Sequence, residues 1–422
     1  MKKTTREDIE KEMKEIKNLP IQEQRVHWSL ELEDWKKNKP DPSIFNFQLL
    51  LFAYNINIKF NQMTKRLEIE DPDNRLGLPI IGIYEEQQRA FLNELCRTYK
   101  LPVTSVQDWV FLSAQPYHPF KDWIMQLHRK WDGKNRLDEL FKTLNVKKDK
   151  ELASEYFRIW CLQTARNLLT DRGYVNEYVL VLKGEQGAGK TKWIRKLAKD
   201  DFVKTGLQLN PNNKDSVLEA NSVTICELGE LDATTRKADH AQLKAFLSKD
   251  YDYVRRPYGR EEVKMPRKTS FIASVNNETF LVDDTGNRRY LVVEVGNINY
   301  QHNIDMQSFW YEMYHVARRT DSKIYLDGEF RKLQEQQAEK FRTMHPIEEA
   351  IHHGVDTLYK ESYSIKELIE VLTGIDRPSQ NDCKVAKQTM LSLGWDVKQK
   401  GGRAYQLINP NLKSETDASH PF

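Results

Sequence analysis

The stretch "GEQGAGKTKW" (residues 184–193) directly follows the apolar run "EYVLVLK" (177–183). Its glycines, lysine and threonine match every fixed position of GxxxxGK[ST], a loop whose backbone N–H groups surround phosphates at the start of a helix. The apolar run before the loop and the helical pattern after it supply the strand and helix that this motif requires. We therefore expect a phosphate-binding loop whose contacts come from Gly184, Gln186, Gly187, Ala188, Gly189, Lys190, Thr191 and Lys192.

The residue types of this loop indicate which cofactors it binds. Lys190 is expected to neutralise the β- and γ-phosphates, and Thr191 to ligate Mg²⁺. The expected cofactors are therefore ATP and Mg²⁺. The alternative is a glycine turn that matches the pattern by chance, which the flanking strand and helix disfavour.

A second strand, within "NSVTICELGELD" (221–232), supplies carboxylates. Glu227 ends the apolar run, and Glu230 follows three residues later. We assign Glu227 to the Mg²⁺ shell and Glu230 to polarising the attacking water, although the two could exchange these roles. The alternative is that both are helix-start carboxylates beside a helix dipole.

Two further polar positions follow in the chain. Asn276 ends the apolar strand of "KTSFIASVNN" (268–277), where we expect it to contact the γ-phosphate and the water; the alternative is a turn former. Arg288 and Arg289 precede the strand in "DDTGNRRYLVVEV" (283–295). One of them is expected to act as an arginine finger toward a neighbouring subunit's ATP, and the alternative is a surface salt bridge.

Length and composition set broad limits. The chain has 422 residues, enough for two or three domains, and 65 Lys and Arg against 62 Asp and Glu, a net charge of +3. The four cysteines form no CxxC pair, which disfavours a zinc site or a disulfide framework. No apolar run of about 18 residues occurs, so we expect no membrane partner and a cytoplasmic protein.

The alternation of short apolar strands with helices predicts an α/β fold with a parallel sheet. We divide the chain into a mostly helical N-terminal domain of unknown role, a helical lead-in, an ATPase core, a winged-helix-like C-terminal domain and a tail. The N-terminal domain also contains a possible strand pair in "IKFNQMTKRLEIE" (58–70). The boundaries are 1–115, 116–175, 176–330, 344–410 and 411–422.

Two segments are candidates for DNA binding. The segment "YDYVRRPYGREEVKMPRK" (251–268) predicts a basic hairpin, in which Arg255, Arg256, Tyr258, Arg260 and Lys264 would contact phosphates, sugars or bases. The alternatives are a solvated charged hairpin and, for Arg267, a place at the ATP interface. For the C-terminal domain, DNA binding and protein interaction are alternatives. The cations that would line its DNA face are Lys384, Lys387, Lys398, Lys400 and Arg403.

Together, "GEQGAGKTKWIRKLA", "CELGELDATTRK", "DDTGNRRYLVVEV" and the lead-in "HPFKDWIMQLHRKWDGKNRLDEL" resemble the virulence-associated protein E family. These P-loop ATPases of phages and genomic islands are similar to superfamily-three replicative helicases of the AAA+ class. The resemblance covers roughly residues 115–295. It implies an AAA+ core in a homo-oligomeric ring, a hexamer, with ATP sites between subunits, the hairpin in the pore and nucleic acid passing through it. Many members carry a primase domain, but no primase carboxylates are found here, so a primase would be a separate partner.

The expected function is an ATP-dependent DNA helicase or translocase that acts on single-stranded or forked DNA in replication of a phage or mobile element. One alternative is an origin-binding ATPase that marks or melts DNA without processive unwinding. Another is an ATP-switched module that only changes its contacts with replication proteins. A small-molecule kinase is disfavoured because no substrate lid or acceptor pocket can be identified.

Overall fold

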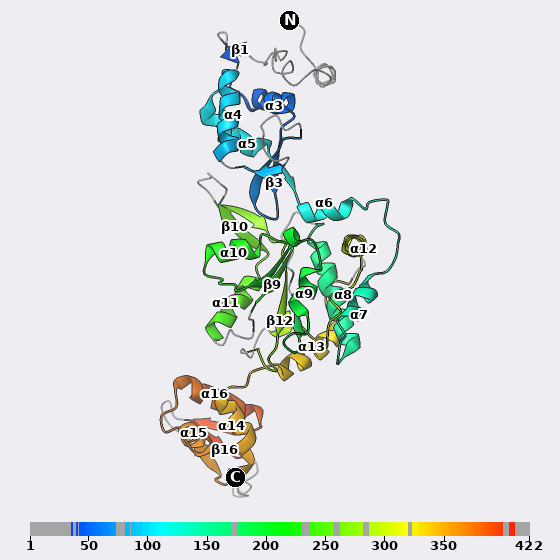
Figure 1. The fold of residues 1–422 in the computed structure, drawn as a ribbon. Helices are drawn as coiled ribbons and strands as arrows, with labels where there is room; N and C mark the ends of the chain where they lie inside the picture. Colours follow the sequence, from blue (N-terminus) through cyan, green and yellow to red (C-terminus); the bar gives the residue numbers. More distant parts are fainter. Residues whose placement is uncertain are drawn as a thin grey trace, which may run out of the picture. The chain divides into compact units, whose positions relative to one another are not determined.

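The structure is a computed structural model, and it divides into two compact units, Met1–Glu278 with Thr285–Glu339, and Thr279–Asp284 with Lys340–Phe422 (Figure 1). The residues that it describes are 35–36, 39–40, 42–72, 81–84, 86–169, 176, 178–229, 231, 237–255, 262–281, 287–319, 323–399 and 405–409. The segment 1–34, which belongs to the expected N-terminal domain, and the tail 411–422 lie outside them.

A five-stranded sheet of parallel strands is the centre of the first unit, in the order β13-β7-β12-β9-β8. The prediction of an α/β fold with a parallel sheet is confirmed. Every residue of β7 is buried, as expected for a strand covered on both faces. The strands are β7 (Val179–Lys183), β8 (Val203–Leu207), β9 (Ile225–Leu228), β12 (Ser270–Val275) and β13 (Tyr290–Glu294).

Helices cover both faces of this sheet, with α10 and α11 on one side and α8 and α9 on the other (Figure 1). The indole N–H of Trp160 donates to the Phe271 carbonyl oxygen at 2.8 Å, which holds α8 against β12. The indole of Trp310 donates to the Leu197 oxygen at 2.7 Å and holds α12 beside the end of α9. The helices are α6 (Pro119–Met125), α7 (Leu137–Thr143), α8 (Lys150–Arg166), α9 (Lys190–Arg195), α10 (Lys214–Ala220), α11 (Lys237–Leu247), α12 (Met306–Ala317) and α13 (Gly328–Lys340), with 3-10 turns η2 (Asp200–Phe202) and η3 (Asn287–Arg289).

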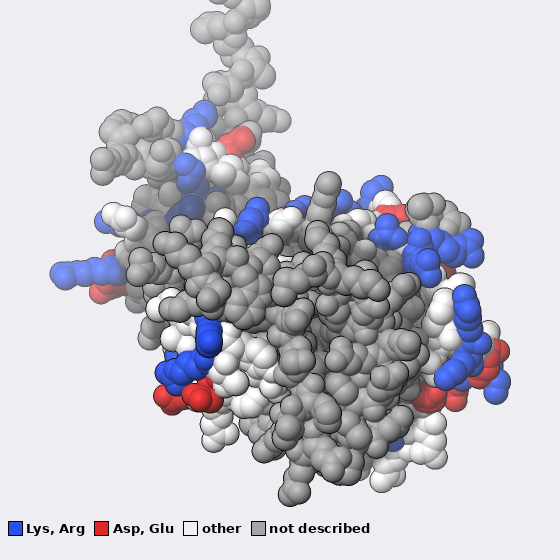
Figure 2. Space-filling view, turned by 90° about the horizontal axis from the view of Figure 1, so that it is seen from above, with Lys and Arg blue, Asp and Glu red and all other residues white. Residues whose placement is uncertain are grey.

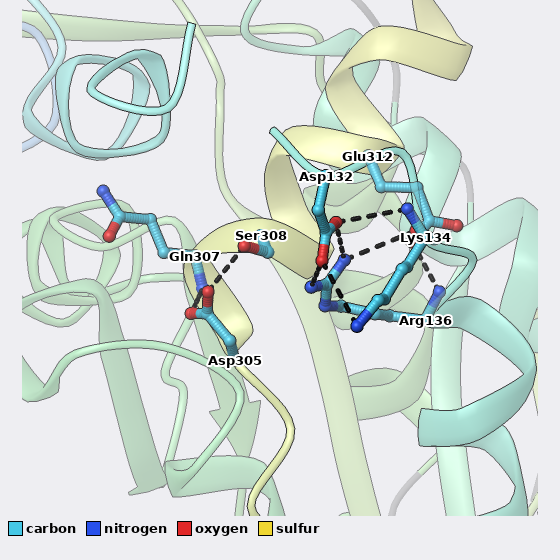
Figure 3. A network of polar contacts seen from close by, with 7 residues as sticks. All are labelled: Asp132, Lys134, Arg136, Asp305, Gln307, Ser308 and Glu312. Carbon is cyan, nitrogen blue, oxygen red and sulfur yellow. Dashed lines mark hydrogen bonds and ion pairs between the residues drawn. The ribbon is translucent and has the colours of Figure 1, made fainter. Parts of the chain in front are cut away.

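A polar network joins the lead-in loop before α7 to α12 (Figure 3). The Arg136 guanidinium donates to both oxygens of Asp132, at 2.8 and 2.7 Å, and its backbone N–H donates to Glu312 Oε2 at 2.7 Å. Burial raises the pKa of Glu312, against the lowering effect of the backbone N–H groups of Arg136 and Leu137. The Glu312 carboxylate therefore caps the start of α7, which fixes the lead-in "WDGKNR" to α12.

The N-terminal part of the first unit contains more β-structure than its sequence predicts. The strands β5-β4-β3-β6 form a four-stranded sheet, in which β3 and β4 are the antiparallel pair expected within residues 58–70. The description of this segment as mostly helical is therefore incomplete. The elements are β1 (Trp35–Lys36), β2 (Lys39–Pro40), α3 (Ile44–Ala53), β3 (Asn57–Asn61), β4 (Arg66–Glu70), β5 (Ile81–Ile83), α4 (Glu86–Thr98), η1 (Val103–Ser105), α5 (Val106–Ser113) and β6 (Gln115–Tyr117).

A buried histidine lies where this segment meets the core. His118 is 3% exposed, and its Nδ1 accepts the backbone N–H of Lys121 at the start of α6. Burial, and then the charges of Lys268, Lys65 and Lys121, lower the pKa of His118 to about 3. His118 is therefore held neutral in a cationic environment.

This environment predicts acid sensitivity. The unfolded chain binds a proton at His118 below about pH 6.5, whereas the folded chain does not, so stability falls as the pH drops through that value. We expect a loss of about 2 kcal/mol by pH 5 from this group. His118→Asn keeps a side-chain acceptor for the helix start and should remove this part of the pH dependence. The check is urea unfolding of both proteins at pH 7 and pH 5; an equal loss in the variant would contradict the assignment.

The second unit is a small α/β unit with its own core. Its three strands pair in the order β14-β16-β15, with one α-helix before the first strand in sequence and two α-helices between the first and the second. Capping boxes start two helices, Ser364 with Glu367 at α15 and Ser379 with Asp382 at α16. The elements are α14 (Pro346–Gly354), η4 (Val355–Thr357), β14 (Ser362–Ser364), α15 (Ile365–Thr373), α16 (Gln380–Ser392), β15 (Asp396–Gln399) and β16 (Tyr405–Ile408).

None of the four cysteines is disulfide-bonded, in agreement with their spacing. Among the described helices, none is both long and apolar enough to cross a membrane.

Candidate functional site

The glycine-rich loop joins β7 to α9, as the motif requires, and Lys190 is the first residue of α9. Gly187 and Gly189 have φ angles of 85° and 88°, a region that side chains with a Cβ rarely adopt. A Cβ on Gly184 would lie 2.7 Å from the Val295 carbonyl oxygen. The three glycines are thus needed for the path of the loop.

The Lys190 side chain folds back onto the start of this loop. It is 7% exposed, and its Nζ donates to the carbonyl oxygens of Gly184 and Glu185, at 2.6 and 2.8 Å. Nζ also donates to Oδ1 of Asn276 at 2.8 Å. The expected strand-end asparagine and the loop lysine are thus in direct contact, which positions the ammonium between β7 and β12.

Glu227 and Thr191 are also in contact. Glu227 is 1% exposed, and its Oε1 accepts the hydroxyls of Thr191 at 2.9 Å and Ser274 at 2.7 Å. Its Oε2 accepts the backbone N–H of Gly206 at 3.1 Å. A carboxylate beside the loop threonine forms the oxygen donor set that Mg²⁺ prefers, with the remaining positions left to water and phosphate.

Sequence reasoning missed Ser274. It precedes Asn276 by two residues, and side chains two apart in a strand share a face, so this spacing was the available signal. Glu230, the second expected carboxylate, lies outside the described residues.

The chemical types of these groups fit ATP and Mg²⁺. A buried ammonium, a hydroxyl beside a buried carboxylate and a glycine cradle meet at the carboxyl ends of parallel strands, where ligands bind in open α/β sheets. Within the described ranges, no group of three or more His, Cys, Asp or Glu side chains could hold a metal ion by itself. Such an all-protein cage is not required for Mg²⁺ bound together with phosphates.

A charge cluster beside the loop was not predicted. Lys183, the last residue of β7, is 5% exposed and contacts Glu278 at 2.6 Å and Glu294 at 3.2 Å. Burial lowers the pKa of Lys183, but the hydrogen bonds to the two carboxylates outweigh this effect and leave it raised. Because Glu294 ends β13 and Glu278 follows β12, the lysine holds the ends of three adjacent strands together.

Arg288 and Arg289 lie at the opposite end of the sheet. They immediately precede β13, whose first residue, Tyr290, pairs with Val179 at the start of β7. The loop follows the far end of β7, about 16 Å away for a five-residue strand. Arg288 is exposed and Arg289 is half-buried. The structure therefore does not bring these arginines to the loop of their own chain.

The predicted hairpin is observed as β10 (Tyr251–Arg255) paired antiparallel with β11 (Glu262–Pro266). Lys264 lies on β11 with its Nζ 3.9 Å from the centre of the Tyr251 ring. Tyr253, opposite Lys264, is 68% exposed and was not predicted. Arg255 ends β10, whereas Arg256, Tyr258 and Arg260 lie outside the described residues.

Arg267 anchors the base of this hairpin. Its guanidinium lies 4.1 Å from the centre of the Phe246 ring and donates to the Phe246 carbonyl oxygen at 2.6 Å. Its backbone N–H donates to the Asp250 oxygen at 2.9 Å. These contacts place Arg267 against the end of α11.

Comparison with solved structures identifies similar chains. The apo structure of the NrS-1 C terminal region (305-718) is 14% identical, with 88% of this chain and 99% of that chain covered and a TM-score of 0.45. The A form apo structure of the same region is 13% identical, with 86% and 98% covered and the same TM-score of 0.45. Scores and identities this low support no conclusion about how this chain works.

No curated protein matches the chain significantly. The family model described as "Virulence-associated protein E-like domain" matches residues 124–343. This range includes the glycine loop, both strand-end positions, the hairpin and the arginine pair, and it extends beyond the expected end near residue 295. Because the match covers just over half of the 422 residues, the chain belongs to the virulence-associated protein E-like family.

Proposed function

We propose that this chain is a P-loop ATPase of the AAA+ class that uses ATP hydrolysis to translocate on, and separate, DNA strands in replication of a phage or mobile element. One observation carries the proposal: the adjacent residues Lys190 and Thr191 of the glycine loop contact Asn276 and Glu227, respectively, at the ends of two other strands. Family membership agrees with it.

Each residue has a definite role in this proposal. Lys190 binds the β- and γ-phosphate oxygens, and the Thr191 hydroxyl with the Glu227 carboxylate holds Mg²⁺. Asn276 orients the attacking water, and Glu230 accepts its proton. When bound, ATP with Mg²⁺ supplies the phosphoanhydride bond and the charge that holds the phosphates. Ser274 and Gly206 hold Glu227 in place through hydrogen bonds.

A ring is the second part of the proposal. Arg288 and Arg289 lie a strand length from their own loop, so an arginine finger among them would serve a neighbouring subunit. A cyclic head-to-tail assembly satisfies this at every interface, and a hexamer is the form that we propose.

The hairpin is the proposed DNA-binding element. In Figure 2, several of the described Lys and Arg side chains lie beside Asp or Glu. Cations paired in this way do not by themselves mark a DNA surface. The proposal depends instead on the hairpin position between the acidic strand β9 and β12, and on its exposed Tyr253 and Lys264.

A winged helix is proposed for the second unit. Its order of helix, strand, two helices and two strands, with the last two strands antiparallel, supports this assignment. The outward side of α16 carries Asn381, Lys384 and Gln388, which are exposed. Such side chains suit contacts with DNA as well as with protein, and a separate primase is the protein partner that we propose.

One experiment separates the candidate functions: the rate of ATP hydrolysis with and without single-stranded DNA, measured together with particle mass and strand separation. A translocating helicase hydrolyses ATP faster on DNA, separates strands and has the mass of a ring. An origin-binding ATPase prefers one duplex sequence and does not unwind processively. An ATP-switched module hydrolyses slowly and is indifferent to DNA, which would contradict the proposal.

The hairpin makes a separate prediction. Changing Arg256, Arg260 and Lys264 to Ala removes three cations and no proposed ATP ligand, so DNA stimulation and unwinding should fall together while DNA-independent hydrolysis and particle mass persist. Each lost phosphate contact should reduce the slope of log affinity against log salt on single strands by about 0.7. Salt titration of binding measures this change.

A matched control for this triple variant removes three exposed cations elsewhere, Lys323, Arg331 and Lys332. Two of them make only exposed ion pairs, which contribute little to stability. Normal unwinding by the hairpin variant would show that the hairpin is not the DNA-binding element. The second unit would then be the main candidate for DNA binding.

A further inference from the structure

The segment after β13 lies against the glycine loop. The backbone N–H of Val295 donates to the Lys183 oxygen at 2.8 Å, and that of Ile298 donates to the Ala188 oxygen at 2.9 Å. Residues 295–300 therefore follow the outer side of the loop from its start to its end. The segment brings Tyr300, a half-buried aromatic residue, to the start of α9.

The Tyr300 ring lies beside Gly189 and Lys192. A Cβ built on Gly189 would be 2.7 Å from Cδ1 and 3.3 Å from Cε1 of Tyr300, so the ring edge touches the loop backbone. The ammonium of Lys192 lies over the ring, 4.9 Å from its centre. Lys192 is an exposed side chain, so it can leave this position at little cost.

The loop has two distinguishable ends. Lys190 and Asn276 mark the end for the terminal phosphate, because the loop lysine reaches the β- and γ-phosphates. The nucleoside of a bound triphosphate must then lie at the other end, toward Lys192 and the first turn of α9. Tyr300 is at that end.

A second backbone segment lies near this end of the loop. The Thr143 carbonyl oxygen accepts the N–H of Asn299, the neighbour of Tyr300, at 2.9 Å, and further back Val146 forms a β-bridge with Val295. The backbone of residues 143–147 therefore runs alongside the segment that carries Tyr300. A flat group bound between the first turn of α9 and residues 143–147 would therefore contact the Tyr300 ring.

We propose that Tyr300 stacks on the nucleobase of the bound nucleotide, while Lys192 moves from the ring face to the phosphates. The inference rests on the proposed nucleotide site and adds to it the residue that recognises the base. Every base has a π-face, so stacking strengthens binding of any nucleoside triphosphate without selecting among bases by hydrogen bonds. An inorganic polyphosphate gains nothing from the ring.

The test compares ATP with inorganic tripolyphosphate, both with Mg²⁺, by titration calorimetry on the full chain. Tyr300→Ala should weaken ATP binding roughly 5- to 150-fold and leave tripolyphosphate binding unchanged. Tyr300→Phe should bind ATP like the wild type, because it keeps the ring. Tyr300→Leu keeps apolar bulk against Gly189 but has no π-face, so it should lose affinity as Tyr300→Ala does. Tyr359→Ala, at a tyrosine 76% exposed in the second unit, is the matched control.

Three results would overturn the proposal. If Tyr300→Leu retains ATP affinity, the ring only supports the conformation of the loop. Equal losses of affinity for ATP and tripolyphosphate in Tyr300→Ala would mean the same. Unchanged ATP affinity in Tyr300→Ala would mean that the ring does not contact the base. Lys190→Ala separates this failure from that of the nucleotide site itself: if it binds both ligands like the wild type, the site is wrong, whatever Tyr300 does.

Discussion

Lys190→Ala is expected to abolish ATP hydrolysis. The Lys190 ammonium is held by the Gly184 and Glu185 carbonyl oxygens and Asn276 Oδ1, at 2.6 to 2.8 Å, so it is already in place before phosphate arrives. Such preorganised charge stabilises the negative charge of the transferring phosphoryl group without reorganisation during the reaction. We expect the rate of phosphate release to fall by roughly 100-fold or more.

The control for this loss is Lys199→Ala, a change at an exposed lysine shortly after α9. Because Lys190 is 7% exposed, its removal could also disturb packing, so Lys190→Met, which keeps the aliphatic length, should be equally inactive while unfolding at the wild-type temperature. Hydrolysis at the wild-type rate in either Lys190 variant, in a preparation free of other ATPases, would refute the nucleotide site.

The local part of this site could be predicted from sequence because it is contiguous. The strand, the glycines, Lys190 and Thr191 occupy a short stretch, and the conformations of Gly187 and Gly189 depend mainly on local sterics. The parallel sheet followed from the same alternation of strands and helices. What the sequence could not supply was which strand ends become neighbours.

The contacts of Lys183 illustrate that limit. It meets Glu278 and Glu294, which follow it by 95 and 111 residues. Nothing in the local pattern reports such a pairing, since β7 has its partners β12 and β13 only once the sheet has formed. The same holds for Ser274 and Glu227, which are 47 residues apart. Long-range side-chain pairs therefore had to come from the structure.

The N-terminal sheet was partly missed for a different reason. The β3–β4 pair alternates over five residues on each side and was recognised, but β5 and β6 have three residues each. Three residues are too few to show a period of two, so such strands are defined by pairing rather than by pattern. The helical pattern of residues 84–115 beside them is the stronger signal in this segment.

Glu227→Gln is expected to cause the second large loss, through the metal. The Glu227 carboxylate faces the Thr191 hydroxyl at 2.9 Å and is 1% exposed, so its charge acts in a water-poor site where it attracts Mg²⁺ strongly. Glutamine keeps the shape and still has an oxygen for the Gly206 N–H, while its NH₂ can donate to the Thr191 and Ser274 hydroxyls. The fold should therefore survive, and hydrolysis should fall roughly 100-fold and require more Mg²⁺.

The matched variant Glu230→Gln decides how the two carboxylates divide their roles. If Glu230 accepts the proton of the attacking water, this variant should bind ATP with the wild-type Mg²⁺ requirement and hydrolyse it slowly. If the roles are reversed, the two phenotypes should be exchanged. The measurement is hydrolysis as a function of Mg²⁺ concentration, with ATP binding measured separately. Normal turnover and normal Mg²⁺ dependence in both variants would exclude β9 as the acidic strand, because no buried carboxylate beside Thr191 could then be acting on the metal or the water.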